Sequence, residues 1–362
     1  MDLFDDLPEP TQTSGESSVG SIFISSDLRA LRSFSGGRVL YLRAQGLFVF
    51  SCSTTMFVCF FSSNQMRADV NTTRRGEGPS HALFVCSGLP VLRAYVAARR
   101  GEREEMQDAH VLLPDMSSCL SRVSYFAVFD GHGGARASQF AAENLHHILA
   151  KKFPRGDAEN VDKLIKRCLL DTFKQTDEDF LKKASSQKPA WKDGSTATCV
   201  LVVDDMVYVA NLGDSRVSWE SVTLALSKEH NPTIYEERMR IQRAGGTVRD
   251  GRVLGVLEVS RSIGDGQYKR CGVISTPDLR RCQLTPNDRF VILACDGLFK
   301  VFSADEAVKF VLDVLQEGSA EQRAGLMEGE QRFEAACQQL AGEAVRRGCA
   351  DNVTVILVSI GC

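Results

Sequence analysis

Five aspartates in the sequence lie directly beside short apolar segments. They are Asp108, Asp130, Asp214, Asp296 and Asp351. Each alone is most often a turn residue, but a carboxylate at the end of a buried strand is costly unless a partner neutralises it. Several such carboxylates predict a cluster at one edge of the sheets, and an all-oxygen cluster favours Mg²⁺ or Mn²⁺ over zinc. Two such ions would make a bridging water nucleophilic, and such a centre most often attacks phosphorus.

The segment 125–134, YFAVFDGHGG, places chemistry-bearing residues at the end of one apolar run. Its aromatic and β-branched start predicts a buried strand. Gly131 then allows a sharp turn and a close backbone approach. Asp130 and the Gly131 carbonyl offer the oxygen ligands that hard divalent cations take, and His132 is placed for proton transfer. The alternative reading is a strand, a tight turn and a helix N-terminus with a surface aspartate and histidine.

Regular elements that could position these residues begin near residue 82. Strands are predicted at 91–98, 109–113, 125–129, 289–297 and 352–360, and a hairpin at 196–214 with its turn at Asp204 and Asp205. Helices are predicted at 135–150, 161–183, 232–244, 303–315 and 331–347, with Ser303 and Glu306 forming a capping box. Hairpins with helices between them favour antiparallel sheets covered by helices, an α+β class, over a doubly wound parallel sheet.

The first 80 residues differ in composition from the rest of the chain. Residues 1–38 are rich in Ser, Gly, Thr and acidic side chains, which predicts disorder, and 67–80 are typical of a linker. We therefore expect a disordered or poorly defined extension over 1–80 and a single domain, large enough for an enzyme, over 81–362.

The run from 44 to 66 contains no charged residue and is flanked by Arg43 and Arg67. That length could span a bilayer. Four hydroxyl side chains, however, occupy its middle: Ser51, Ser53, Thr54 and Thr55. We expect an exposed apolar extension, or sequence foreign to the domain, rather than a membrane span.

Composition excludes several classes of protein. The chain has 362 residues, 43% hydrophobic and 25% charged, and a net charge of -3, so no general attraction to nucleic acid is implied. The 12 cysteines show no C-x-x-C pair or zinc-type spacing. An acidic opening at residues 2–9 does not resemble a secretory signal. These features indicate a reduced, intracellular protein.

Seven segments carry a resemblance to a known family: RGEREEMQDAH, YFAVFDGHGG, DGSTATCVLVV, ANLGDSR, RVLGVLEVSRSIGD, LACDGLF and ADNVTVILV. In this order they resemble the motif series of the metal-dependent protein serine/threonine phosphatases of type 2C, over about residues 90–360. The resemblance implies two stacked antiparallel β-sheets flanked by helices, a four-layer sandwich, with a two-metal site at one end. It also implies Mg²⁺ or Mn²⁺ as cofactor, two per subunit, with a weaker third ion.

The resemblance assigns roles to the individual residues. Asp130 would bridge both metals, Gly131 would supply its carbonyl, and Asp296 and Asp351 would ligate one metal.

Four further residues receive roles in the same way. Asp108 would act through metal-bound water, and Asp214 would help to hold the third ion. Arg103 would bind the substrate phosphate, because a planar guanidinium can clamp two oxygens, and His132 would be the general acid.

The sequence departs from the family pattern in three places. Gln107 stands where the family often has Glu, and Lys300 stands where many members have an acid that helps to bind the third metal. After Arg216 the segment VSWESVTLALSKEH is short and polar, which predicts a shortened or frayed sheet edge.

Three functions compete. The favoured one is a phosphatase in which metal-activated water attacks phosphoserine or phosphothreonine, with His132 as acid and Arg103 on the phosphate. The alternative is an inactive pseudophosphatase that acts as a binding module. The third is a nuclease, which is disfavoured because the sequence shows no pattern of basic residues typical of a nucleic-acid groove. We expect a monomer that is located in the cytoplasm or also in the nucleus. Its expected partners are phosphorylated protein substrates and a kinase signalling complex, and no nucleic acid or membrane partner is expected.

Overall fold

The computed structural model describes residues 47–52, 55–60, 90–116, 122–154, 160–219, 226–323 and 329–361. It divides into compact units, with the boundary after Val85. The segments 1–38 and 67–80, for which disorder and a linker were predicted, lie outside the described residues.

The residues that are described in the N-terminal unit, Pro8–Val85, form an antiparallel hairpin. Its strands are β1 (Leu47–Cys52) and β2 (Thr55–Phe60), and both fall inside the uncharged run 44–66. Aromatic and β-branched residues at this density favour strands. None of the helices in the described part of the chain is long and apolar enough to cross a membrane.

The second unit contains a five-stranded antiparallel sheet in the order β14-β9-β8-β5-β4. Its strands are β4 (Ala109–Leu113), β5 (Val123–Phe129), β8 (Ala197–Val203), β9 (Met206–Leu212) and β14 (Asp278–Gln283). The predicted hairpin is confirmed, because β8 and β9 join at Asp204, whose φ of 56° is left-handed, and Asp205.

A second antiparallel sheet has four strands in the order β10-β15-β16-β3. They are β3 (Val91–Arg99), β10 (Arg216–Trp219), β15 (Phe290–Ala294) and β16 (Val353–Gly361). The edge strand β10 is only four residues long, and residues 220–225 after it lie outside the described residues.

Alternating side chains of β5 show how the layers form. Tyr125 and Phe129 pack into a core that includes residues of two helices on the outer face of their sheet. Phe126 and Val128 point the other way, into a core shared with β10, β15 and β16. A third core joins the four-stranded sheet to another helix pair. The helices are α1 (Arg136–Lys152), α2 (Val161–Ser185), α6 (Ala304–Arg323) and α7 (Gly329–Arg346).

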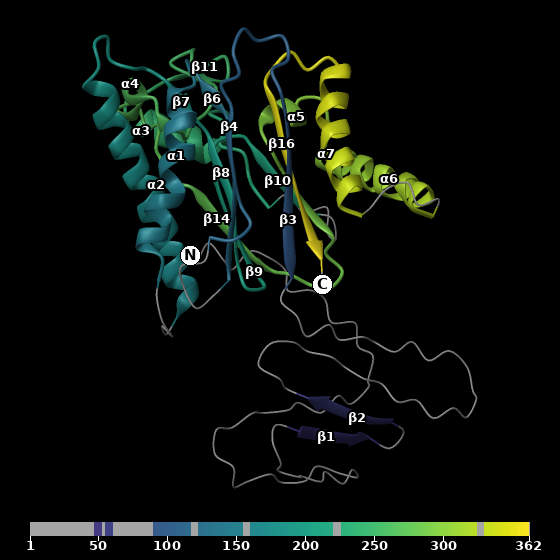
Figure 1. Ribbon diagram of the computed structural model, residues 1–362. Helices are drawn as coiled ribbons and strands as arrows, with labels where there is room; N and C mark the ends of the chain where they lie inside the picture. The colour runs from purple at the N-terminus through teal and green to yellow at the C-terminus, as the bar shows by residue number, and fades with distance from the viewer. Residues whose placement is uncertain are drawn as a thin grey trace. The chain divides into compact units, whose positions relative to one another are not determined.

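The result is two stacked antiparallel sheets with helices on both outer faces, as predicted (Figure 1). In Figure 1, α1 and α2 cover one face and α6 and α7 the other. The capping box is also confirmed: Ser303 N–H donates to Glu306 at 2.8 Å, and Glu306 N–H donates to Ser303 Oγ at 3.2 Å.

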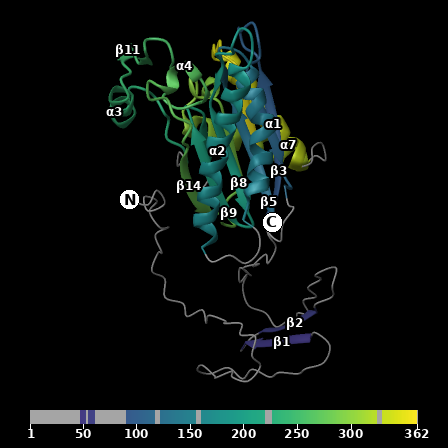
Figure 2. The same cartoon turned by 90° about the vertical axis from the view of Figure 1, so that its left-hand side faces the viewer.

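Short elements surround one end of the sheets. A three-stranded sheet has the order β13-β7-β6, from β6 (Gly131–His132), β7 (Gly194–Ser195) and β13 (Ile263–Gly264). A small subdomain follows, with α3 (Tyr235–Arg243), β11 (Val248–Arg249), β12 (Arg252–Val253) and α4 (Gly266–Lys269). It has its own core around Ile241 and Val253, and Figure 2 shows α3 and β11 standing to one side of the sheets. The last short helix is α5 (Asp296–Phe299).

Candidate metal centre

Strand pairing brings the predicted acidic residues to one end of the sheets. Ala109 pairs with Phe129, so the start of β4 lies beside the end of β5. The pairing of Ala294 with Val355 places the end of β15 beside the start of β16 in the same way. The aspartates that flank these strands, and the one after β9, therefore share one end: Asp108, Asp130, Asp214, Asp296 and Asp351.

Three of these carboxylates form a close group. One oxygen each from Asp130, Asp214 and Asp296 lie within 4.8 Å of one another. Burial first, and neighbouring carboxylates second, raise the pKa of Asp130 well above its usual value and the pKa of Asp214 to about 7. Such a group of like charges is unfavourable unless a cation neutralises it, so these oxygens fit a divalent ion of the hard class.

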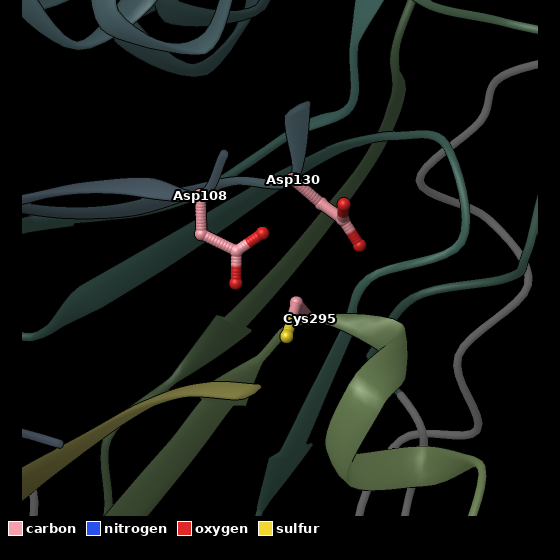
Figure 3. A group of neighbouring side chains, drawn as sticks. All are labelled: Asp108, Asp130 and Cys295. Carbon is pink, nitrogen blue, oxygen red and sulfur yellow. The ribbon is translucent and has the colours of Figure 1, made fainter. Parts of the chain in front are cut away.

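Asp108 joins Asp130 in a second group, with Cys295, as Figure 3 shows. Asp108 Oδ2 accepts a hydrogen bond from Thr354 Oγ1 at 2.6 Å, while its buried Oδ1 has no hydrogen-bond partner among the described residues. Burial, with the charges of Asp296 and Asp351 adding to it, raises the pKa of Asp108 to about 6. A buried oxygen atom without a hydrogen-bond partner is normally satisfied by a water molecule or an ion, which agrees with a metal centre at this position.

The sulfur of Cys295 lies beside this group but has other partners. Its Sγ accepts from Thr354 N–H at 3.1 Å and donates to the Asn352 carbonyl at 3.4 Å. Burial raises the pKa of the Cys295 thiol well above its usual value, and both hydrogen bonds of the sulfur are made with backbone groups rather than left open for a ligand. The donor set is therefore oxygen, which favours Mg²⁺ or Mn²⁺ over zinc. Cys295 was not predicted from the sequence, where its only signal is its place between β15 and Asp296.

Gly131 is required by close packing. A Cβ at this position would lie 2.3 Å from the Gln107 carbonyl oxygen and 2.7 Å from Ser138 Oγ. The backbone of Gln107 is itself fixed, because its N–H donates to Asn352 Oδ1 at 2.8 Å. The turn after Asp130 can therefore approach the start of β4 only without a side chain.

Asp351 lies in neither group of three oxygen or sulfur ligands found among the described residues. Its Oδ2 accepts from Lys300 Nζ at 2.5 Å and from Arg103 at 2.9 Å. Lys300 Nζ also lies 2.7 Å from Asp296 Oδ2. Burial opposes both charges, but the ion pairs outweigh it: they lower the pKa of Asp351 and raise the pKa of Lys300. Lys300 was predicted to lie near the third ion, and the structure places it between Asp296 and Asp351.

The predicted general acid, His132, and the predicted phosphate-binding residue, Arg103, lie beside the carboxylates. The His132 side chain is 31% exposed, and its Nε2 lies 2.7 Å from Asp265 Oδ2, a contact that was not predicted from the sequence. Burial would lower the pKa of His132, but Asp265 above all outweighs it, so the pKa is raised. The guanidinium of Arg103 has a side-chain exposure of 61%, so it is accessible to a ligand.

A cavity of about 360 Å³ opens beside the carboxylates, between the sheet ends and the subdomain that contains α3. It is lined by Asp214, Arg216, Glu229, Asn231, Thr233, Asp250, Gly251, Arg252, Glu258, Asp296, Phe299 and Lys300. A substrate that reaches the carboxylates therefore meets charged side chains of both signs.

Residues 93–353, which include all five of the clustered aspartates, Arg103 and His132, match the model of the family "Protein phosphatase 2C". The chain belongs to the protein phosphatase 2C family. It is 55% identical to the human "Integrin-linked kinase-associated serine/threonine phosphatase 2C", and the alignment covers 100% of both chains. The mouse protein of the same name is 66% identical over 295 residues, covering 76% of this chain and 75% of its own. Metal-dependent phosphoester hydrolysis is the norm in this family.

Solved structures agree with the family assignment. A serine-threonine phosphatase 2C from Toxoplasma gondii superposes with a TM-score of 0.61 at 25% identity, covering 76% of this chain and 96% of that one. A C. elegans sex determining protein gives 0.63 at 26% identity, covering 75% of this chain and 65% of that one. The resemblance to the type 2C phosphatases is confirmed, and so is the fold of antiparallel sheets flanked by helices.

Proposed function

We propose that this phosphatase 2C chain is an active phosphoprotein phosphatase that uses Mg²⁺ or Mn²⁺ to hydrolyse phosphoserine and phosphothreonine. The observation that carries the proposal is the group formed by Asp130, Asp214 and Asp296, whose oxygens lie within 4.8 Å at the end of both sheets. Asp108, with its unpartnered Oδ1, adjoins the group. Asp351 would complete the ligands once its contacts with Lys300 and Arg103 give way to an ion.

The chemistry that such ions supply when bound is activation of water as a nucleophile and neutralisation of phosphate charge. The chain's own residues do the rest. Arg103, exposed beside Asp351, holds two phosphate oxygens through its guanidinium. As water adds to phosphorus and the ester bond breaks, His132 gives a proton to the departing serine or threonine oxygen. The products are the free hydroxyl side chain and inorganic phosphate.

One observation favours the second candidate, a pseudophosphatase that binds partners without turnover. Lys300 bridges Asp296 and Asp351 at 2.7 and 2.5 Å, so an ammonium already neutralises two predicted metal ligands. The same predicted ligands are otherwise intact, and Arg103 and His132 are both present, which supports the enzyme instead.

The partners proposed for this chain follow from its relatives. The human relative is named for association with integrin-linked kinase. We extend that association to this chain, with phosphorylated proteins as substrates, because the identity spans the full length of both chains.

Phosphate release from a phosphothreonine peptide tests the function. Purified protein with Mn²⁺ should turn the peptide over, exhaustive chelation should stop the reaction, and returning Mn²⁺ should restore it. Full activity in a chelated sample that contains no detectable metal would exclude the metal-dependent reaction. An absence of turnover in protein shown by calorimetry to bind Mn²⁺ would favour the pseudophosphatase.

Substitutions locate the reaction in the centre. Asp130→Asn and Asp296→Asn should each abolish turnover and weaken Mn²⁺ binding in calorimetry, because each removes a ligand oxygen. The exposed Asp179 of α2 provides a matched control, and Asp179→Asn should keep both properties. Near-normal turnover of either ligand variant at ordinary Mn²⁺ concentration would place the centre elsewhere.

A further inference from the structure

One buried carboxylate contacts the proposed general acid yet has no part in metal binding or phosphate recognition. Asp265 is 2% exposed, and its Oδ2 lies 2.7 Å from His132 Nε2, across 133 positions of sequence. A buried carboxylate is costly unless hydrogen bonds satisfy it. Ser262 Oγ supplies a second one to the same oxygen at 2.7 Å. Asp265 is thus held by two partners, and one of them is the residue that moves the proton.

The contact selects the state of the imidazole ring. A carboxylate accepts hydrogen bonds but donates none, so Nε2 of His132 carries a hydrogen toward Asp265. The proton available for transfer is then the one on Nδ1. When Nδ1 gives it to the leaving alkoxide, the ring remains as the Nε2–H tautomer, which is the tautomer that Asp265 stabilises.

A single small sheet carries both partners. In β6 His132 pairs with Gly194 of β7, and on the other edge Gly194 pairs with Gly264 of β13, the residue before Asp265. Asp265 N–H donates to the Asp193 carbonyl at 3.0 Å. Its φ of 53° is left-handed, a conformation that non-glycine residues hold at a cost when surrounding contacts impose it.

Gly194 shows how closely the pair is packed. A Cβ at this position would lie 2.1 Å from Asp265 Oδ2 and 2.2 Å from His132 Nε2. Any side chain there would push the carboxylate and the ring apart, so the backbone of β7 sets the place where the two meet.

We infer that Asp265 is the positioning residue for His132: it fixes the ring orientation and the tautomer from which Nδ1 donates to the leaving group. The inference rests on the proposed phosphatase function and deepens it. Asp265 touches neither substrate nor metal in this assignment, and it acts only through His132.

Two substrates with different leaving groups test the assignment. Serine and threonine alkoxides need protonation as the ester breaks, whereas nitrophenolate leaves without it. Asp265→Asn should lower kcat on a phosphothreonine peptide by about 10- to 100-fold, the range found when a residue that orients a functional side chain is lost. Its kcat on nitrophenyl phosphate should change by less than about threefold, and KM for the peptide should stay the same. Gly194→Ala, which separates the pair sterically, should show the same substrate dependence.

A matched control is available in the same scaffold. Asp177 is also a buried carboxylate, but it binds Gly264 N–H at 2.8 Å and Lys269 at 3.0 Å rather than His132. Asp177→Asn makes the same chemical change, so any damage from scaffold distortion should lower the rates on both substrates equally. Thermal unfolding of each variant shows whether it is folded.

A double variant decides whether Asp265 acts through His132. Residues that act as a unit give non-additive losses, so His132→Ala with Asp265→Asn should lose no more rate on the peptide than His132→Ala alone. Equal losses on the two substrates for folded Asp265→Asn, or additive losses in the double variant, would overturn the assignment while leaving the phosphatase function in place. A metal-loaded wild type that hydrolyses neither substrate would overturn the proposed function and this assignment together.

Discussion

At the scale of single residues, the centre is governed by charge balance. Lys300 is the one cation seen to join two of the predicted ligands within the described residues, Asp296 and Asp351. A divalent ion that binds these carboxylates must displace the ammonium or tolerate its charge nearby. The residue at position 300 is therefore expected to set how much metal the protein needs.

Replacing Lys300 by a neutral or acidic residue tests this expectation. Lys300→Met and Lys300→Asp should lower the Mn²⁺ concentration that gives half-maximal binding and activity, with the larger effect for Asp, because the competing charge is gone. Calorimetry and metal titration of turnover measure the change. Lys309→Met, at an exposed lysine of α6, serves as the control and should leave both curves in place. An unchanged titration for both Lys300 variants would show that its ammonium does not compete with the ion.

The raised carboxyl pKa values predict how the metal-free protein responds to pH. The pKa is about 6 for Asp108 and about 7 for Asp214, above their ordinary value of 3.8. At pH values between about 4 and the raised pKa of each group, these carboxyls are protonated in the folded state but ionised in the unfolded state. The contribution of these carboxyls to the stability of the folded state therefore falls as pH rises from about 4 to 7. Asp278, whose pKa is lowered to about 2, acts in the opposite direction below this window. Burial lowers the pKa of His110, His146 and His230, and these groups act in the opposite direction within the window.

Thermal unfolding with a chelator at pH 5 and pH 7.5 should show the lower midpoint at pH 7.5. Added Mg²⁺ or Mn²⁺ should narrow the difference, because an ion replaces the protons as the neutralising charge. Asp214→Asn removes one of the titrating groups, so the pH dependence should be shallower. A chelated wild type that is more stable at pH 7.5 than at pH 5 would contradict the electrostatic account.

At the scale of elements, a buried ion-pair network fastens the subdomain containing α3 to the main sheets. Glu237 of α3 accepts from Arg240 and Arg261, each at 2.7 Å, and also from Ser260. Arg261 in turn pairs with Asp278 of β14 at 2.7 Å. Burial opposes the Glu237 charge, but the two arginines outweigh it and hold the pKa of Glu237 well below its usual range.

Breaking this network should destabilise the fold. Glu237→Gln leaves two partly buried guanidinium groups without their carboxylate, which costs about 3 kcal/mol or more when a buried pair loses one partner. Urea denaturation measures the loss. The neighbouring Glu236 is exposed, and Glu236→Gln should change the unfolding free energy by less than about 0.5 kcal/mol. Equal stabilities for the two variants would show that the network contributes little.

At the scale of the whole molecule, the units on the two sides of the boundary after Val85 differ in their share of the described hydrophobic cores and site residues. The four hydrophobic cores found in the described residues all lie between Leu92 and Val358. The carboxylate group, Arg103 and His132 also belong to this part of the chain. The N-terminal unit thus supplies neither core nor site residues to the phosphatase unit among the residues described.

A chain that begins at Cys86 should therefore fold and retain phosphatase activity. Its urea midpoint and its kcat on a phosphothreonine peptide should match those of the full chain, since cores and site are kept together. Full-length protein measured in parallel is the reference. A lower midpoint or a lost activity in the shortened chain would assign the N-terminal unit a part in stability or catalysis.

The sequence by itself determined what is local. A short apolar run rich in aromatic and β-branched residues predicted the strand at 125–129, the paired aspartates Asp204 and Asp205 predicted the hairpin turn, and Ser303 with Glu306 predicted a helix start. Each depends on side-chain periodicity, turn conformation or capping within a few residues, so each can be seen without the fold. The acidic residues at strand ends were visible for the same reason, and antiparallel pairing then made their convergence an expectation.

Only the tertiary structure decided which distant residues meet. The strands of the small sheet are two residues long and carry no periodic signal, so the contact of His132 with Asp265 was not visible. The bridge from Lys300 to Asp351 crosses 51 positions. Both contacts depend on sheet packing and long-range register, because side-chain patterns determine each element alone, whereas the packing of all elements together determines the distances between their ends.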